Sequence, residues 1–221
     1  FVMTLTGEGP VSVALSDIWD RGAAGWGSDG SLDAIVLFRS STNAADNVVK
    51  IISGDSSGAG HFVAEEQTRD VGCIYALSMA VADLDGDGAD DIAVVCGDSS
   101  DLSTSGDHFV VFLSGAATAY SASSPYEIVD PYSVRGGTLK TGDPRISSIA
   151  AGDFDGDGDK DLAIVCQDSS SGTQDVWVFT NDGTGAFSFG TRQAIDEDPV
   201  SIAVGNFNMD NNSGVPVDDL A

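Results

Sequence analysis

Two short acidic segments constrain this chain more than any other feature. Residues 83–91 read D-L-D-G-D-G-A-D-D and residues 153–161 read D-F-D-G-D-G-D-K-D, so both carry carboxylates at positions 1, 3, 5 and 9 and glycines at positions 4 and 6. Carboxylates this close repel one another unless a cation lies between them. Ca²⁺ takes six to eight oxygen ligands at roughly 2.3–2.6 Å in a flexible geometry, and glycine permits the tight backbone turns that such a loop needs. Each segment is therefore predicted to bind a calcium ion.

The ligands expected at each site follow from these positions. Position 7 of such a loop adds a backbone carbonyl, which would come from Ala89 and Asp159. The side-chain ligands would be Asp83, Asp85, Asp87 and Asp91 in the first loop, and Asp153, Asp155, Asp157 and Asp161 in the second.

The sequence around the loops distinguishes them from an EF-hand, whose loop also begins D-x-D-x-D-G. An EF-hand needs a glutamate at position 12, where this chain has Val94 and Ile164. It also needs flanking helices, whereas the flanks here are short runs rich in Val, Ile and Ala, such as residues 92–96 and 162–166. Such runs predict β-strands. The ion is thus expected in the connection between two antiparallel strands.

The motif D-x-D-G-D-G-x-x-D between two apolar strands resembles the calcium-binding FG-GAP repeat, also called the VCBS or integrin-alpha-like repeat. The resemblance implies an all-β fold, in which repeats form four-stranded antiparallel blades of a β-propeller with calcium between the first and second strands of a blade. It also implies an extracellular role in adhesion. Two loops of this chain match the motif fully.

A longer repeat appears when the sequence is aligned outward from the loops. The segments 10–19 and 199–208 match each other and the segments that lead into the two full loops, so that loops start at Asp17, Asp83, Asp153 and Asn206. Each interval has room for four short strands, the content of one blade. We expect one propeller segment over 1–221, with repeats at about 10–67, 74–130, 146–195 and, in part, 200–221.

Short apolar runs bounded by turn residues predict the strands within each repeat, with period-two alternation visible at 175–180, and no window has a helical period. Little helix is expected. The expected strands are 11–17, 33–39, 47–53 and 61–67 in the first repeat, 74–82, 91–97, 108–114 and 126–130 in the second, and 146–152, 161–167, 175–181 and 186–195 in the third.

The first and fourth loops depart from the motif but keep several oxygen ligands. The first has an insertion after Asp17, and its further candidates are Asp29 and Asp33, with Asp20 as a candidate for position 3. The fourth offers amide as well as carboxylate oxygens, both of which Ca²⁺ accepts. Its candidates are Asn206, Asn208, Asp210 and Asp219.

The charge and hydropathy of the chain argue against several classes of partner and against a membrane-spanning helix. The 221 residues include 35 acidic and 9 basic ones, for a formal net charge of −26, which argues against nucleic acid or anionic lipid as a partner. No apolar run approaches the length of about 20 residues that a membrane helix needs, and no signal peptide is visible. Because weak calcium modules suit the high calcium concentration outside cells, an extracellular location is expected.

Three cysteines are too few for a disulfide framework. Cys96 and Cys166 occupy equivalent places in two repeats and are most simply interpreted as buried packing positions. A bridge between Cys73 and Cys96 is the alternative.

No motif in the chain predicts catalysis. Residues 54–58, G-D-S-S-G, match the nucleophile pattern G-x-S-x-G, but no helix is expected after Ser57, and the only histidines are His61 and His108. The segment is interpreted as a hairpin turn, and the protein is not expected to be an enzyme. Trp19 and Trp26, in the glycine-rich insertion of the first loop, could bind a sugar ring or a protein, or could fold back over the blade.

These observations predict a secreted or cell-surface calcium-binding module that binds a glycan or protein ligand, with calcium in a structural role. A subunit of an extracellular filament or surface layer is the main alternative, and a non-catalytic part of a secreted enzyme is a weaker one. Because the chain starts at Phe1 and offers about three blades, we expect an excerpt of a longer protein; association of incomplete blades between chains is the alternative.

Overall fold

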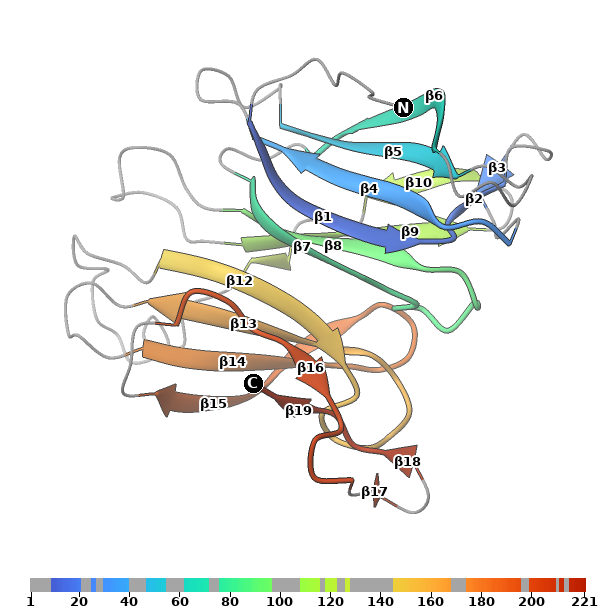
Figure 1. Cartoon of the computed structure of the whole chain (residues 1–221). Helices are drawn as coiled ribbons and strands as arrows, with labels where there is room; N and C mark the ends of the chain where they lie inside the picture. Colours follow the sequence, from blue (N-terminus) through green and yellow to red (C-terminus); the bar gives the residue numbers. More distant parts are fainter. Residues whose placement is uncertain are drawn as a thin grey trace.

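Three antiparallel β-sheets stacked face to face make up most of the described part of the chain in the computed structural model (Figure 1). The structure describes residues 9–20, 25–26, 30–39, 47–54, 62–71, 76–96, 108–115, 118–122, 126–127, 145–167, 174–195, 199–209, 211–212 and 215–221. All regular elements in these ranges are strands.

The four longest strands of each of the three sheets are neighbours in the order in which they follow one another along the chain, except that two short strands, Trp19–Asp20 and Gly25–Trp26, lie between the first two strands of the first sheet in sequence and pair with each other. The first sheet contains β1 (Pro10–Ser16), β4 (Asp33–Phe38), β5 (Val48–Gly54) and β6 (Phe62–Asp70), in that order. The second contains β7 (Ala76–Ala82), β8 (Asp91–Cys96), β9 (His108–Gly115) and β10 (Thr118–Ala122), with β11 (Tyr126–Glu127) also paired to β9. The third contains β12 (Arg145–Gly152), β13 (Asp161–Gln167), β14 (Gln174–Asn181) and β15 (Phe187–Ile195).

The first strands of the sheets lie next to one another, with β1 against β7 and β7 against β12. β12 in turn contacts β16 (Val204–Gly205), which pairs with β19 (Asp219–Leu220) and belongs to the partial fourth repeat. Two further short ladders join β2 (Trp19–Asp20) to β3 (Gly25–Trp26) and β17 (Asn211–Asn212) to β18 (Val215–Pro216).

A β-bulge recurs at the same place in all three first strands. The register of β1 shifts between Pro10 and Ser12, that of β7 between Ala76 and Ser78, and that of β12 between Ile146 and Ser148. Each of these serines lies five residues before the first aspartate of its loop. A bulge strengthens the local twist of a strand. Because the three bulges lie at equivalent positions, the three first strands have this extra twist at the same distance from their loops.

Apolar side chains from the facing sheets fill the two spaces between them. Successive residues of β8 point to opposite faces, so Ile92 and Val94 pack toward the first sheet while Ala93 and Val95 pack toward the third. Trp177 of β14 is almost fully buried in the second of these cores. The core is therefore shared between repeats, and no single sheet could bury both of its faces alone.

The described strands confirm an all-β fold of antiparallel sheets. The largest difference from expectation is the fourth strand of the second repeat, which is split: β10 pairs with the last part of β9 and β11 with its first two residues. Only β11 falls in the range expected for this strand. In the part of the chain that the structure covers, no helix is long and apolar enough to cross a membrane.

Cys96 is fully buried in the core between the first and second sheets, as the sequence predicts, and it is also disulfide-bonded. The side chains of Cys73 and Cys166 lie outside the described residues. Cys96 pairs with Ala76 across the ladder, three residues after Cys73 in the sequence, so the bridge from Cys73 to Cys96 stays a prediction.

Candidate metal centre

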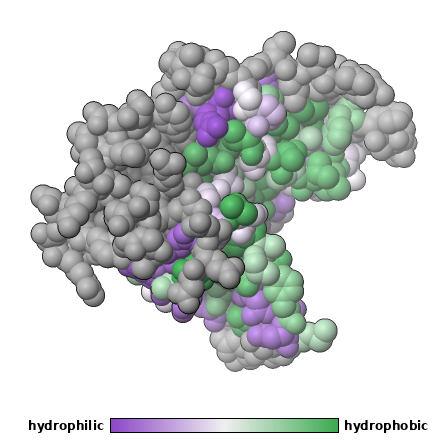
Figure 2. Space-filling model, turned by 60° about the vertical axis from the view of Figure 1, so that its left-hand side comes forward, coloured by the Kyte–Doolittle hydropathy of each residue, from purple (hydrophilic) through white to green (hydrophobic). Residues whose placement is uncertain are grey.

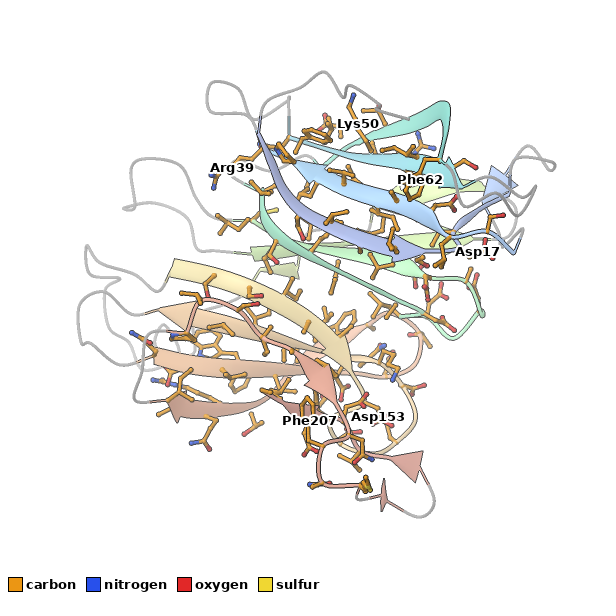
Figure 3. All side chains as sticks on the ribbon, viewed as in Figure 1. Asp17, Arg39, Lys50, Phe62, Asp153 and Phe207 are labelled. Carbon is orange, nitrogen blue, oxygen red and sulfur yellow. The ribbon has the colours of Figure 1, made fainter. Side chains whose placement is uncertain are left out.

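The two full acidic loops connect the first and second strands of their sheets, as the sequence predicts. Residues 83–90 lie between β7 and β8, and residues 153–160 lie between β12 and β13. Both loops leave the same end of the stacked sheets, and Asp17 and Asp153 lie just beyond the ends of β1 and β12 (Figure 3).

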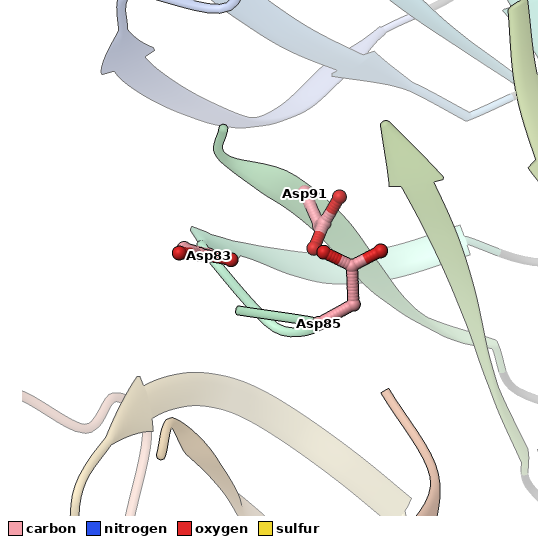
Figure 4. Close-up of side chains that lie close together, drawn as sticks. All are labelled: Asp83, Asp85 and Asp91. Atoms are coloured by element: carbon pink, nitrogen blue, oxygen red, sulfur yellow. The ribbon is translucent and has the colours of Figure 1, made fainter. Parts of the chain in front are cut away.

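The turn of the main chain brings three carboxylates of each loop together. One oxygen from each of Asp83, Asp85 and Asp91 lies within 4.8 Å of the others (Figure 4), and the residues at the same positions of the other loop, Asp153, Asp155 and Asp161, form an equivalent group. Two oxygens on opposite sides of a calcium ion are separated by about twice the Ca–O distance of 2.3–2.6 Å. The spacing of positions 1, 3 and 9 and their hard oxygen donors thus fit this ion.

The carboxylate at position 1 holds the loop in its turn. Asp83 accepts hydrogen bonds from the amides of Gly86 (2.8 Å) and Gly88 (3.0 Å). Asp153 accepts the equivalent bonds from Gly156 (2.7 Å) and Gly158 (3.0 Å).

All four glycines have positive φ angles, between +76° and +104°, which residues with a side chain rarely adopt. The glycines at positions 4 and 6 are therefore required by the backbone, and the amides that they direct inward keep the first carboxylate in place.

The carboxylate at position 9 is buried and anchors the start of the loop. Asp91 accepts a hydrogen bond from the amide of Leu84 (2.8 Å), and Asp161 accepts one from Phe154 (2.9 Å). Asp161 also accepts one from the amide of Asn181 at the end of β14 (2.9 Å). A carboxylate has about four lone-pair sites, so these bonds leave acceptor capacity for an ion.

Several of these carboxyl groups bind protons more tightly than free aspartate does. Burial raises the pKa of Asp161 to about 6, against hydrogen bonds from Asn181 and Phe154 that lower it. Desolvation also raises the pKa values of Asp85 and Asp155, and the neighbouring loop carboxylates add to both. Desolvation is thus the main cause of these shifts, and a cation close to the carboxylates would favour their deprotonated form.

A hydrogen bond connects positions 5 and 7 in both full loops. Asp87 and Asp157 are not among the three carboxylates that meet, and each accepts the amide hydrogen of the residue at position 7, Ala89 or Asp159, at 2.9 Å. These bonds orient the peptide at position 7. Whether Asp87, Asp157 and the two carbonyls ligate an ion stays a prediction.

The first loop reproduces two of the anchoring interactions despite its insertion. Asp17 accepts a hydrogen bond from Gly30 (2.8 Å), whose φ is +87°, and Asp33 accepts one from Ile18 (3.0 Å). Asp17 and Asp33 are thus equivalent to positions 1 and 9. Asp29 and the side chain of Asp20 lie outside the described residues.

The fourth loop keeps the anchor at position 9. Asp219 accepts hydrogen bonds from the amides of Phe207 (2.8 Å) and Asn208 (3.1 Å), and the side chain of Asn208 donates to its other oxygen (3.2 Å). Asn206 precedes Phe207 as position 1 does in the other loops. Asp210 lies outside the described residues.

The same bond from the amide at position 2 to the aspartate at position 9 therefore occurs in four loops. Independently, residues 153–213 match the family model of the FG-GAP-like repeat, a segment that runs from the start of the third loop into the fourth. The chain contains an FG-GAP-like repeat. No curated protein matches the chain.

The structure also reveals residues that connect consecutive loops and that the sequence analysis did not single out. Asp218 accepts a hydrogen bond from the amide of Asp153 (3.0 Å) and forms an ion pair with Lys160 (3.2 Å). These two contacts connect the fourth loop to the third. Ser16 donates a hydrogen bond to Asp90, which connects the first loop to the second. Only the repetition of the motif could have suggested that consecutive loops meet, because these partners are far apart in sequence.

The other candidate features lie mostly outside the described part of the chain. Trp19 pairs with Trp26 in the ladder of β2 and β3, and β3 lies beside β10, but the tryptophan side chains are not described. His61 and residues 55–58 are likewise outside, and His108 is placed only as the first residue of β9.

Proposed function

We propose that this protein is a calcium-binding β-propeller segment of the FG-GAP type, in which calcium stabilises the loops that join the first two strands of each blade. One observation carries the proposal: three carboxylates meet at the same positions in both full loops. In metal-free protein these charges repel one another, so an ion that binds only the folded state stabilises it by mass action. The three stacked sheets with neighbouring first strands support the propeller.

The direct test is calcium binding by the complete chain and by single-loop variants. We expect Asp85→Ala and Asp155→Ala each to remove about one bound Ca²⁺ per chain in calorimetric titration, because each deletes one of three converging ligands. A matched control is Asp70→Ala, since this exposed aspartate is the last residue of β6 in the first sheet and lies in neither loop.

The melting temperature gives a second readout. EDTA is expected to lower it substantially in the unmodified chain and by less in each loop variant. An equal melting temperature with calcium and with EDTA would exclude a stabilising ion.

We further propose that the protein acts outside the cell as a non-catalytic adhesion or ligand-binding module. The FG-GAP-like repeat at 153–213 supports an integrin-alpha-like module of extracellular type. The ligand class proposed is a glycan or a protein at a cell surface. Binding of the complete chain to a glycan array and to cell-surface proteins, with calcium and with EDTA, tests this; binding that is absent under both conditions would contradict it.

One observation favours a second function, assembly of an extracellular filament or layer. Figure 2 shows hydrophobic surface on the face that it presents, and large apolar side chains are exposed on the first sheet and on the partial fourth repeat. They include Val13 (68% exposed), Leu15 (58%), Phe207 (60%) and Met209 (87%). Electron microscopy of the purified chain distinguishes the two functions, because assembly gives ordered contacts between copies and a binding module gives single particles.

A further inference from the structure

The turn between β14 and β15 lies between the two full acidic loops. A Cβ atom added to Gly183 in this turn would lie 2.6 Å from Oδ2 of Asp159 in one loop, and one added to Gly86 in the other loop would lie 3.2 Å from the carbonyl oxygen of Gly183. The turn therefore touches position 7 of one loop and position 4 of the other.

Asn181, the last residue of β14, connects the two loops directly. Its side chain is buried, with 6% of the residue exposed, and its Nδ2 donates to two backbone carbonyl oxygens. One belongs to Leu84 of the second repeat (2.7 Å) and the other to Lys160 of the third repeat (2.9 Å). The two amide hydrogens of a single side chain are thus divided between the two loops.

Both accepting residues are adjacent to candidate metal ligands. The amide of Leu84 donates to Asp91, and Lys160 directly precedes Asp161, whose Oδ1 accepts the amide hydrogen of Asn181 itself. A continuous set of hydrogen bonds therefore runs from the Asp91 carboxylate through Leu84 and Asn181 to the Asp161 carboxylate. Asp91 and Asp161 occupy position 9 of their loops.

This arrangement links the conformations of the loops. If one loop leaves its metal-binding geometry, a buried donor of Asn181 and its carbonyl acceptor lose their partners, which is unfavourable. An ion that fixes one loop also fixes Asn181, and so lowers the cost of ordering the other loop. Linkage requires that the effect be equal in both directions.

We propose that Asn181 couples the two loops, so that a divalent cation in loop 83–91 raises the affinity of loop 153–161 for a second cation, and the reverse. This inference rests on the proposed calcium binding and goes beyond it. Asn181 is a positioning residue, since it acts through Leu84 and Asp161. Direct repulsion between two bound cations would lower the affinity for the second cation. Without Asn181, binding at one loop is therefore expected to leave the affinity of the other loop unchanged or to lower it slightly.

The experiment follows each loop separately in the complete ¹⁵N-labelled chain during titration with CaCl₂. The amides of Gly88 and Gly158, which donate to Asp83 and Asp153, report the two loops. In the otherwise unmodified chain, Asp155→Ala is expected to weaken calcium binding at loop 83–91 about fivefold or more, and Asp85→Ala to weaken loop 153–161 by the same factor.

The variant Asn181→Leu keeps the approximate size of the side chain and removes both donors, and in this background the two effects are expected to disappear while both loops still bind calcium. Asn181→Ser, which can donate one hydrogen bond at most, is expected to reduce them and serves if the leucine variant does not fold. Thr184→Ala is the matched control. It removes a hydrogen bond to Asp182 within the same turn and is expected to leave the coupling unchanged.

The outcomes separate this inference from the proposed function. If both loops bind calcium but the affinity of each is unchanged by loss of the other site, the inference is wrong and the proposed calcium binding is still supported. Coupling that persists in the Asn181 variants would also overturn it. If neither loop of the unmodified chain binds calcium, both proposals fail.

Discussion

At the scale of single residues, the acidic loops depend on backbone angles that only glycine adopts easily. Gly158 has a φ of +104°, and a Cβ atom placed there would meet no other atom within 4 Å. A substitution at this position is therefore strained by the backbone alone and not by a clash with a neighbour. The amide of Gly158 also fixes the Asp153 carboxylate at 3.0 Å.

Gly158→Ala is accordingly expected to destabilise the protein by about 1–2 kcal/mol, the cost of a left-handed residue with a side chain. Urea denaturation in excess calcium measures the change. The matched control is Gly9→Ala, because Gly9 also has no atom within 4 Å of an added Cβ but lacks a positive φ. A loss of stability as large in the control as in Gly158→Ala would contradict the backbone explanation.

The raised pKa values of the loop carboxyl groups give a dependence on pH with a defined sign. Burial raises the pKa of Asp161 to about 6, so at pH values between its unfolded and folded pKa the folded state binds more protons than the unfolded state. Without metal, this group's contribution to stability is complete below about pH 4 and is lost as the pH rises through about 6.

With calcium the trend should reverse, since the ion needs the deprotonated carboxylates. The gain in melting temperature on adding calcium is thus expected to increase from pH 5 to pH 7. Melting curves with calcium and with EDTA across this range measure the difference. A gain that is constant or falls with pH would show that these groups do not titrate against the ion.

At the scale of secondary-structure elements, loops and sheets are joined because the loop residue at position 2 belongs to the core. Leu84 is 1% exposed and packs among residues of the second and third sheets. Its amide donates to Asp91 and its carbonyl accepts from Asn181. Packing between the sheets and the geometry of the loop thus depend on the same residue.

Leu84→Ala is expected to cost about 2–5 kcal/mol, the range for a leucine removed from a packed core. Leu32→Ala is the control, because Leu32 occupies position 8 of the first loop and is 59% exposed, and a change within about 0.5 kcal/mol is expected there. Chemical denaturation in EDTA measures both without a contribution from metal. Similar losses in the two variants would contradict the role of inter-sheet packing.

At the scale of the whole molecule, stacked sheets share their cores, and the first sheet presents apolar side chains on its other face. Val13 and Leu15 of β1 are more than half exposed, on the face opposite the core shared with the second sheet. Apolar side chains exposed on a sheet face favour association with another surface.

The double variant Val13→Thr and Leu15→Thr is therefore expected to reduce self-association, which analytical ultracentrifugation over a range of protein concentrations measures. Threonine is polar and has the β-branched shape that suits a strand. Val200→Thr is the comparison, since Val200 is also exposed but lies outside β1. If Val200→Thr reduces association and the double variant does not, the interface lies elsewhere.

The sequence alone was enough to predict those parts of the fold that depend on local spacing. Short apolar runs, bounded by turn residues, placed the strands β4, β5, β8, β13 and β14 within a residue or two of their observed limits, because such a run is the local pattern of a strand that is buried on both faces. The strand β10 was not predicted, because residues 118–122 have no local strand pattern and are placed by their pairing with β9.

What the sequence by itself determined is the pair of acidic turns and the order of strands around them, because nine consecutive residues fix both the convergence of the carboxylates and the need for glycine. What only the tertiary structure decided is how the turns meet. The bond between Asn181 and Leu84 spans 97 positions, and the bond between Ser16 and Asp90 spans 74. Such contacts exist because whole sheets stack with their first strands side by side, and no property of the segments taken separately specifies which side chain will lie between them.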